Sequence, residues 1–436
     1  MNRLFLCIFY INFFNLYAQN TTQIIFEEEN QAFRDSIEMV RLQNEKQEAK
    51  IRLESYKILK DKSSVVYLNL SHLELNSIPD IVYEFPNVKR LNLSNNTIHK
   101  LPRKIKKLDS LKYLNLSFND LENRKLKVGR NKNIKKVYFD HNNLTNLSKS
   151  VKRFKGLHEI MLDNNDFKDF PEVLSKIKTL THLDINYNPL ELQNTSFKEF
   201  RQLKALRMVN CKLDSIPTDL YSLNQLKQLN ISHNNLIALP KGLKNLINLE
   251  RIGLYNNLLT SLPDELFELV NLNEIDIYYN HIEKIPDAIT KLKKLEVLYI
   301  SNNLIYSIPE TIGELTSLKR LYIHHNRMSN LPTSIQYLDQ LEVLHINDNY
   351  FTYIPSPIFQ LETLVDLDIS RNQIIYIPEQ IVNLSSLKYF FFSKNPIDMN
   401  HSGNNHLKRT IEVLREKNVL VRFNNLEKTI GIDDEY

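Results

Sequence analysis

The feature that most constrains this chain is a period of 23 residues. Eight prolines recur at that interval without a slip: Pro217, Pro240, Pro263, Pro286, Pro309, Pro332, Pro355 and Pro378. Fifteen repeats share the register, and they start at Val65, Val88, Leu111, Ile134, Leu157, Leu180, Leu203, Leu226, Leu249, Leu272, Leu295, Leu318, Leu341, Leu364 and Leu387. A fixed period over most of a chain predicts one elongated array rather than several globular domains.

Within each repeat the apolar residues follow the pattern LxxLxLxxNxLxxLPxxLxxLxx, in which positions 4 and 6 alternate as in a β-strand. In the repeat that begins at Leu226, this alternation directs Leu229 and Ile231 inward and Gln228 and Asn230 outward. One repeat is too short to bury its apolar face alone. Stability must therefore come from stacking on neighbouring repeats.

This pattern resembles the leucine-rich repeat family, and the resemblance covers about four-fifths of the chain. It implies an α/β fold, a right-handed horseshoe solenoid of about fifteen repeats. A parallel sheet is expected on the concave face, loops or helical turns on the convex face, and helical caps at both ends. Lys125, Ser148 and Asn194 stand where proline is expected, so we expect irregular geometry in the third, fourth and sixth repeats.

Four segments are expected along the chain. Residues 1–18 are typical of a signal peptide, with Arg3 before an apolar run and Ala18 before polar residues. Residues 19–62 form a helical segment, which is either a cap that docks Ile51, Tyr56 and Leu59 on the first repeat or a partner helix. The repeats occupy residues 63–400, and residues 401–436 form a C-terminal cap in which Leu407, Ile411 and Leu414 share one helix face and Val419 to Phe423 reads as a strand.

A signal peptide predicts export to the periplasm, the cell surface or the medium; the alternative is a cytoplasmic protein. Together with the repeats, it makes the chain resemble the exported leucine-rich repeat proteins of bacteria. Removal of residues 1–18 would also remove Cys7. Cys211 would then be the only cysteine, and no intramolecular disulfide could form.

Position 9 is asparagine in thirteen of the fifteen repeats. We expect a ladder in which buried amides hydrogen-bond to backbone groups that the turn leaves unpaired. Its members are Asn96, Asn119, Asn142, Asn165, Asn188, Asn234, Asn257, Asn280, Asn303, Asn326, Asn349, Asn372 and Asn395. The exceptions are Leu73 and Cys211, and a structural thiol is the simplest interpretation of Cys211.

The outward positions of the strands differ along the array, and repeats nine to thirteen carry aromatic residues that the repeat itself does not require. They are Tyr299, Tyr322 and His345 at position 5, Tyr255, Tyr278 and His324 at position 7, and Tyr279 and His325 at position 8. Tyrosine and histidine present large amphipathic surface at low entropic cost, as binding hot spots do. Aromatic residues also simply suit strands, but their clustering favours a partner-binding surface.

Charged clusters give weaker signals. Asp120, Asp140, Glu159, Asp163, Asp166 and Asp184 give repeats three to six an acidic character. Asp163, Asp166 and Asp169 lack the glycine and distal Glu of a calcium loop, and His324, His325 and His345 lack a completing ligand, so no metal site is expected. Lys and Arg concentrate on the convex side of repeats two to four; solvation is the simplest role for them, and contact with a membrane surface or polyanion is the alternative.

The sequence points away from catalysis. Only 7 glycines are present, and phosphate loops, zinc-protease and hydrolase motifs are missing from the sequence. We therefore expect a non-enzymatic scaffold without a cofactor that binds a protein on its concave face. Neither nucleic acids nor small molecules are expected as ligands. The alternatives are a cytosolic signalling scaffold that resembles the Ras-group-related leucine-rich repeat proteins, and a cell-surface adhesin or glycan binder.

Overall fold

A computed structural model describes residue 34 and residues 36–193, 195–397 and 404–423. The expected signal peptide and the acidic C-terminal tail lie outside these residues. None of the helices in the described part of the chain is both long and apolar enough to cross a bilayer.

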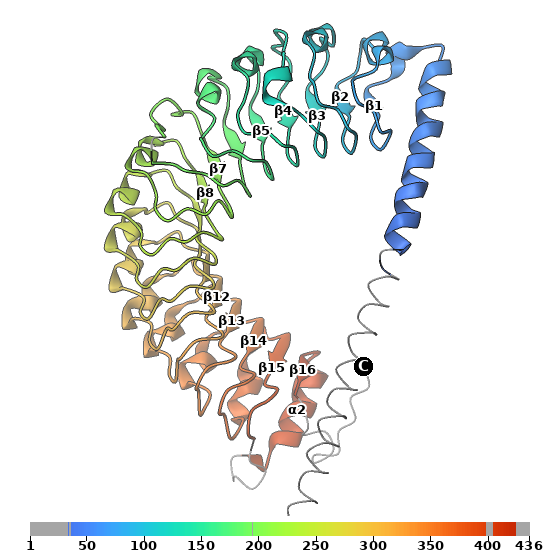
Figure 1. The fold of residues 1–436 in the computed structure, drawn as a ribbon. Coiled ribbons are helices and arrows are strands. Elements are labelled where there is room, and N and C mark those ends of the chain that lie inside the picture. The colour runs from blue at the N-terminus through green and yellow to red at the C-terminus, as the bar shows by residue number, and fades with distance from the viewer. Residues whose placement is uncertain (1–33, 35, 194, 398–403, 424–436) are drawn as a thin grey trace, which may run out of the picture.

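One parallel sheet of sixteen strands runs through the described residues, with the strands in sequence order. The first fifteen strands occupy positions 3 to 5 of the fifteen repeats, and each residue pairs with its equivalent one repeat later. The strands are β1 (Tyr67–Asn69), β2 (Arg90–Asn92), β3 (Tyr113–Asn115), β4 (Lys136–Tyr138), β5 (Glu159–Met161), β6 (His182–Asp184), β7 (Ala205–Arg207), β8 (Gln228–Asn230), β9 (Arg251–Gly253), β10 (Glu274–Asp276), β11 (Val297–Tyr299), β12 (Arg320–Tyr322), β13 (Val343–His345), β14 (Asp366–Asp368), β15 (Tyr389–Phe391) and β16 (Leu420–Arg422). The predicted solenoid and its concave parallel sheet are confirmed (Figure 1).

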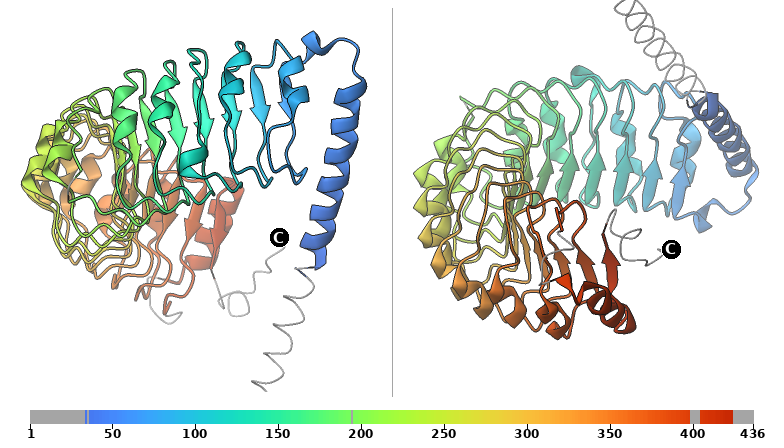
Figure 2. Two further views of the ribbon diagram at one scale, coloured as in Figure 1. Left: turned by 45° about the horizontal axis from the view of Figure 1, so that its top comes forward. Right: turned by 90° about the horizontal axis from the view of Figure 1, so that it is seen from below.

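Short 3₁₀ helices form the convex side, and most begin directly after the proline at position 15. They are η1 (Lys62–Ser64), η2 (Asp80–Glu84), η3 (Arg103–Lys107), η4 (Asn123–Lys125), η5 (Lys149–Arg153), η6 (Glu172–Lys176), η7 (Thr218–Ser222), η8 (Lys241–Asn245), η9 (Asp264–Glu268), η10 (Asp287–Lys291), η11 (Glu310–Glu314), η12 (Thr333–Tyr337), η13 (Ser356–Gln360) and η14 (Glu379–Asn383). Figure 2 shows the strands along the inside of the arc and the helical turns along the outside.

The three repeats that lack the proline differ from one another. The third repeat has only the shortened η4, and no helix is assigned between β6 and β7 among the described residues of the sixth repeat. The fourth repeat keeps a full-length η5, because the Ser148 hydroxyl replaces proline as N-cap and accepts a hydrogen bond from the Ser150 backbone N–H. The expected irregularity is therefore present in the third and sixth repeats and wrong for η5 of the fourth.

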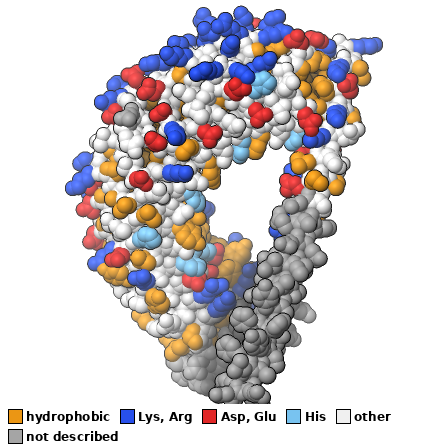
Figure 3. Space-filling view, in the orientation of Figure 1, with side chains coloured by type: hydrophobic (Ala, Val, Ile, Leu, Met, Phe, Trp, Pro, Cys, Tyr) orange, Lys and Arg blue, Asp and Glu red, His pale blue; other side chains and the backbone are white. Residues whose placement is uncertain are grey.

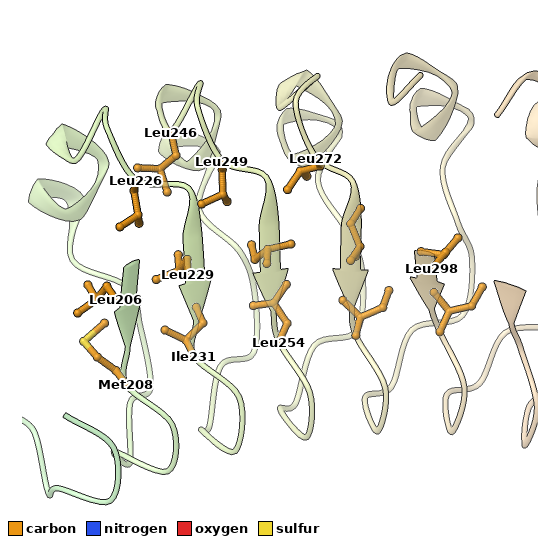
Figure 4. Packing of buried hydrophobic residues seen from close by; sticks show 14 of the residues in the cluster. Leu206, Met208, Leu226, Leu229, Ile231, Leu246, Leu249, Leu254, Leu272 and Leu298 are labelled. Atoms are coloured by element: carbon orange, nitrogen blue, oxygen red, sulfur yellow. The ribbon is translucent and has the colours of Figure 1, made fainter. Parts of the chain in front are cut away.

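A single hydrophobic core runs the length of the arc between the sheet and the helical turns. Leu229 and Ile231 point into it from β8 and the residue that follows, and Leu226 and Leu249 stack along it from successive repeats (Figure 4). Each repeat thus contributes one layer, which explains why the apolar positions recur with so little variation.

The N-terminal helix, described over residues 36–58, lies across the open end of the sheet (Figure 1). Leu53 and Tyr56 pack against the core, and the Arg52 guanidinium donates hydrogen bonds of 3.0 and 3.3 Å to the carbonyls of Asn69 and Ser71. The expectation that Ile51 and Leu59 dock there is wrong, since Ile51 is 63% exposed and Leu59 is 36% exposed. The helix covers the edge of β1 with a different face, and an arginine satisfies the carbonyls of that edge.

At the other end, α2 (Leu407–Glu416) buries Leu407, Ile411 and Leu414 against the last repeat. The strand β16 then pairs with β15 in parallel. The expected helix and strand therefore both lie where the pattern placed them, and together they cover the second open end of the core.

Candidate functional site

The eight aromatic residues of repeats nine to thirteen, which we call the aromatic face, lie on the concave side of the sheet. Tyr299, Tyr322 and His345 are the last residues of β11, β12 and β13. The other five, Tyr255, Tyr278, Tyr279, His324 and His325, follow β9, β10 and β12 by two or three residues. Strand register therefore aligns side chains whose positions in the sequence are far apart.

The position 5 residues form one continuous row. The rings of Tyr299 and Tyr322 stack with their centroids 4.8 Å apart and a 9° angle between their planes. Tyr322 contacts His345 edge to face at 5.1 Å. The Nε2 atom of His345 lies 3.2 Å from Asp366 Oδ2 in the next strand, so a carboxylate ends the row.

A second cluster forms at positions 7 and 8. Tyr255 stacks on Tyr278 at 5.5 Å, and Tyr279 meets Tyr278 edge to face at 4.5 Å. The rings of Tyr278 and His324 lie 5.6 Å apart across the intervening repeat, whose equivalent residue, Ser301, is fully buried. His233, which the sequence interpretation did not include, extends the cluster by contacting Tyr255 at 4.6 Å.

Burial sets the charge of this face. It lowers the pKa of His324 to about 4, with His325 and His345 contributing in the same direction, so the ring is neutral at physiological pH. Burial also raises the pKa of Asp276 to about 6, although its Oδ1 accepts a 3.1 Å hydrogen bond from the Tyr278 backbone N–H. The aromatic face thus carries a neutral imidazole at His324 and is rich in hydroxyl groups, a composition typical of binding hot spots.

Position 8 carries a backbone constraint that the sequence interpretation missed. All fifteen residues at this position have positive φ, between 50° and 61°, and none is glycine. Asparagine tolerates this left-handed conformation, whereas it is uncommon for bulky side chains. Tyr279 adopts this conformation with a φ of 54°, and its side chain is 47% exposed. The strained backbone of the turn therefore directs the Tyr279 ring toward solvent.

The asparagines at position 9 link each repeat to the one before it. Asn257 Nδ2 donates to the carbonyls of Ile231, Leu254 and Tyr255, and its Oδ1 accepts from the Leu236 N–H at 3.2 Å. The equivalent donation to the preceding repeat recurs at each of the other asparagines, namely Asn96, Asn119, Asn142, Asn165, Asn188, Asn234, Asn280, Asn303, Asn326, Asn349, Asn372 and Asn395.

Cys211 replaces two of the three donations and cannot replace the acceptance. Its Sγ lies 3.2 Å from the Ile185 carbonyl and 3.5 Å from the Val209 carbonyl. It offers no strong acceptor to the preceding repeat, where the Leu190 N–H instead donates to the Asn188 carbonyl at 2.9 Å. Burial raises the pKa of the thiol to about 12, which is consistent with a structural rather than a reactive cysteine.

Two of the acidic residues of repeats three to six are paired with a basic side chain. Asp184 is buried and pairs with Arg207 at 3.0 Å, and Glu159 pairs with Lys136 at 2.7 Å. Burial raises the pKa of Asp163 to about 6 while its Oδ1 accepts from the Asn186 N–H at 2.8 Å. Asp184 is therefore not exposed to solvent as the simplest role for a cluster of acidic residues would require. In the described part of the chain no three His, Cys, Asp or Glu side chains cluster as a metal site.

A second concave surface lies at the N-terminal end of the sheet. Tyr67, Tyr113 and Tyr138 line a hollow of about 460 Å³ together with Arg90, whose guanidinium carbon lies 5.2 Å from the centroid of the Tyr113 ring. Tyr67, Arg90 and Tyr113 occupy position 3 of the first three repeats, so the signal for this surface is an aromatic and basic column in the sequence.

Models of the leucine-rich repeat family match most of the repeats. The model described as leucine-rich repeat region matches residues 238–327, and those described as leucine rich repeat match residues 63–121, 225–246 and 339–397. No curated protein matches the chain.

Solved structures with the same fold come from bacteria and plants. A leucine-rich repeat protein of Leptospira interrogans is 26% identical with a TM-score of 0.69, over 85% of this chain and 98% of that one. The leucine-rich repeat ectodomain of a membrane receptor kinase from Arabidopsis thaliana, in complex with Casparian strip integrity factor 2, is 27% identical with a TM-score of 0.53, over 73% of this chain and 43% of that one. An internalin from Listeria monocytogenes is 18% identical with a TM-score of 0.54, over 86% of this chain and 94% of that one. This likeness shows the fold alone.

Proposed function

The chain belongs to the leucine-rich repeat family, and from this premise we propose that it is a non-enzymatic scaffold that binds a protein partner on the aromatic face. The family's fold is typical of protein-binding proteins, and the related plant ectodomain is in complex with a protein ligand. The observation that carries the proposal is the stacking of aromatic rings on the concave surface. The two clusters of the aromatic face place eight Tyr and His side chains on one concave surface, where none of them is needed for the repeat.

The chemistry of this surface suits a folded protein partner. Stacked rings offer broad apolar area that is already ordered, so binding costs little side-chain entropy. Phenol and imidazole groups at the rim of the rings supply hydrogen bonds that set the register of the partner. Tyr322 lies at the middle of the row, where hot spots concentrate, and Tyr299 stacks on its ring.

We test the proposal by replacing Tyr299 and Tyr322 with alanine. Each hot-spot tyrosine contributes about 2 kcal/mol, so either replacement alone should weaken the partner complex about thirtyfold. The matched control replaces Tyr306 and Tyr337, exposed tyrosines of the same two repeats that lie off the concave strands. The assignment would be refuted if the variant with both Tyr299 and Tyr322 replaced still captured the partner. It would also be refuted if replacement of Tyr306 and Tyr337 abolished capture as well. Binding on a glycan array that depends on Tyr299 would support an adhesin instead.

We further propose that the protein is exported, which rests on the pattern of residues 1–18. Cell fractionation followed by N-terminal sequencing tests this proposal. Mature protein that begins after Ala18 and lies outside the cytoplasm supports it, whereas an intact Met1 in the cytoplasmic fraction favours the signalling scaffold.

A further inference from the structure

The convex side of repeats two to four concentrates positive charge far beyond the composition of the chain. Residues 100–110, 123–133 and 146–156 contain fourteen Lys and Arg and one acidic residue, Asp109, whereas the whole chain has a net charge of +5. We call these fourteen residues the basic ridge: Lys100, Arg103, Lys104, Lys106, Lys107, Arg124, Lys125, Lys127, Arg130, Lys132, Lys149, Lys152, Arg153 and Lys155. Figure 3 shows Lys and Arg side chains gathered along the outer edge of the arc near β2 to β5.

Close packing of the repeats brings these charges together. A Cβ on Gly156 would lie 1.9 Å from the Lys132 carbonyl oxygen, and one on Gly129 would lie 2.6 Å from the Arg103 carbonyl oxygen. Only glycine allows the basic segments of neighbouring repeats to approach this far. The fold therefore holds Lys and Arg side chains of neighbouring repeats close together, although like charges repel each other.

Few of these charges are neutralised within the protein. Lys104 pairs with Asp80, and Lys125 pairs with Glu122 at 2.8 Å. Across the residues that the structure describes, no other member of the basic ridge has an ion pair. Lys107 and Arg130 occupy the same position in successive repeats, and both side chains are exposed. A ligand with several negative charges would relieve the repulsion, so binding it should stabilise the fold.

The basic ridge exposes no large apolar or aromatic side chain that could insert into a bilayer or stack on a base. The large hydrophobic side chains that are exposed in the described structure lie outside its three segments, so nothing is available to enter a bilayer. Phe154, the one aromatic residue in the segments, is buried, so no ring can stack on a base. Recognition here must come from charge alone.

The convex shape of the surface favours a flexible polyanion over a rigid one. The basic ridge lies on the convex side of an arc (Figure 1). Duplex DNA is stiff over about 150 base pairs and would touch such an arc at a tangent, whereas a flexible chain can follow it across three repeats. We propose that the basic ridge binds a flexible, linear, anionic polysaccharide through its sulfate or carboxylate groups. This proposal does not depend on the aromatic face.

Calorimetry with a heparin oligosaccharide as probe tests the proposal. The wild-type chain should bind it at low salt, and log Kd should rise linearly with log salt concentration as bound counterions are released. The double variant Lys107→Glu with Arg130→Glu should bind at least about tenfold more weakly, with a shallower salt dependence. The matched control is Lys291→Glu with Lys408→Glu, which replaces two exposed lysines that have no ion pair among the described residues, and it should bind as the wild type does.

Three results would overturn the proposal: unchanged binding by the Lys107 and Arg130 variant, an equal loss in the control variant, or tighter binding of duplex DNA or of phosphatidylglycerol vesicles than of heparin at the same salt concentration. The milder pair Lys107→Gln with Arg130→Gln replaces the double variant if its circular dichroism spectrum differs from the wild type. Heparin should also raise the Tm of the wild-type chain, whereas neutral dextran should leave it unchanged.

Discussion

The rings of Tyr278 and His324 lie 5.6 Å apart although a whole repeat separates them. Ser301 of that repeat is fully buried, so a small side chain leaves room for two larger ones to approach across it. We predict that Ser301→Tyr separates these rings. Two-dimensional NMR should then lose the cross-peaks between Tyr278 and His324, and their persistence would contradict the arrangement. Ser370→Tyr, at the same repeat position beyond the aromatic face, should leave those cross-peaks in place.

The His324 ring should make stability depend on pH. Its pKa is about 4 in the folded chain, below the ordinary value of 6.5, so the unfolded chain binds the proton more readily between these values. The free energy of unfolding contributed by His324 therefore falls as pH falls from 6.5 to 4. Asp276 has a pKa of about 6 instead of 3.8 and acts in the opposite direction over nearly the same range.

Paired variants separate the two groups. When urea denaturation is repeated at decreasing pH, the stability of the His324→Gln chain should rise relative to that of the wild type. The stability of the Asp276→Asn chain should fall relative to that of the wild type over the same range. If either variant follows the wild-type pH profile, the buried group it removes does not titrate as described.

Removal of one rung of the asparagine ladder should destabilise the array. Asn257→Leu leaves the Ile231 carbonyl and the Leu236 N–H without their partner, which should cost about 1 to 3 kcal/mol. Asn257→Cys should cost less, because Cys211 shows that a thiol at this position can approach two of the carbonyls. Urea denaturation measures both. Equal stability of Asn257→Leu and the wild type would contradict the role of the ladder.

The left-handed backbone at position 8 gives a prediction that is independent of ring contacts. Tyr279→Val and Tyr279→Asn both remove the ring, but only asparagine tolerates a φ of 54°. The valine variant should therefore be less stable by about 1 to 2 kcal/mol. Thermal denaturation of the two variants tests this expectation, and equal Tm values would argue against backbone strain at the turn.

The buried thiol of Cys211 should be inert in the folded chain. In a Cys7→Ser background, iodoacetamide at pH 8 should leave Cys211 unmodified, because burial raises its pKa to about 12 and blocks access. The same treatment in guanidinium should modify it fully. Mass spectrometry reads both results, and rapid labelling of the folded chain would show that the sixth and seventh repeats open.

The sequence predicted the fold in detail because each apolar position of the repeat packs against the neighbouring repeats in one shared core. It also predicted which aromatic residues are neighbours, since parallel register aligns equal positions, as for Tyr299 and Tyr322. It could not predict the contact of Tyr278 with His324, which depends on the size of Ser301 in between. The N-terminal helix was mispredicted at Ile51 because the helix meets the edge of a strand, where Arg52 satisfies carbonyls that an apolar stripe could not.

The most direct measurement of the central claim places a photoactivatable benzoyl group at single sites. With p-benzoylphenylalanine in place of Tyr299, irradiation of the partner complex should produce a covalent adduct with the partner. With the same residue in place of Tyr337, which is 60% exposed in η12 on the convex side, it should produce none. An adduct from position 337 with none from position 299 would contradict binding on the aromatic face.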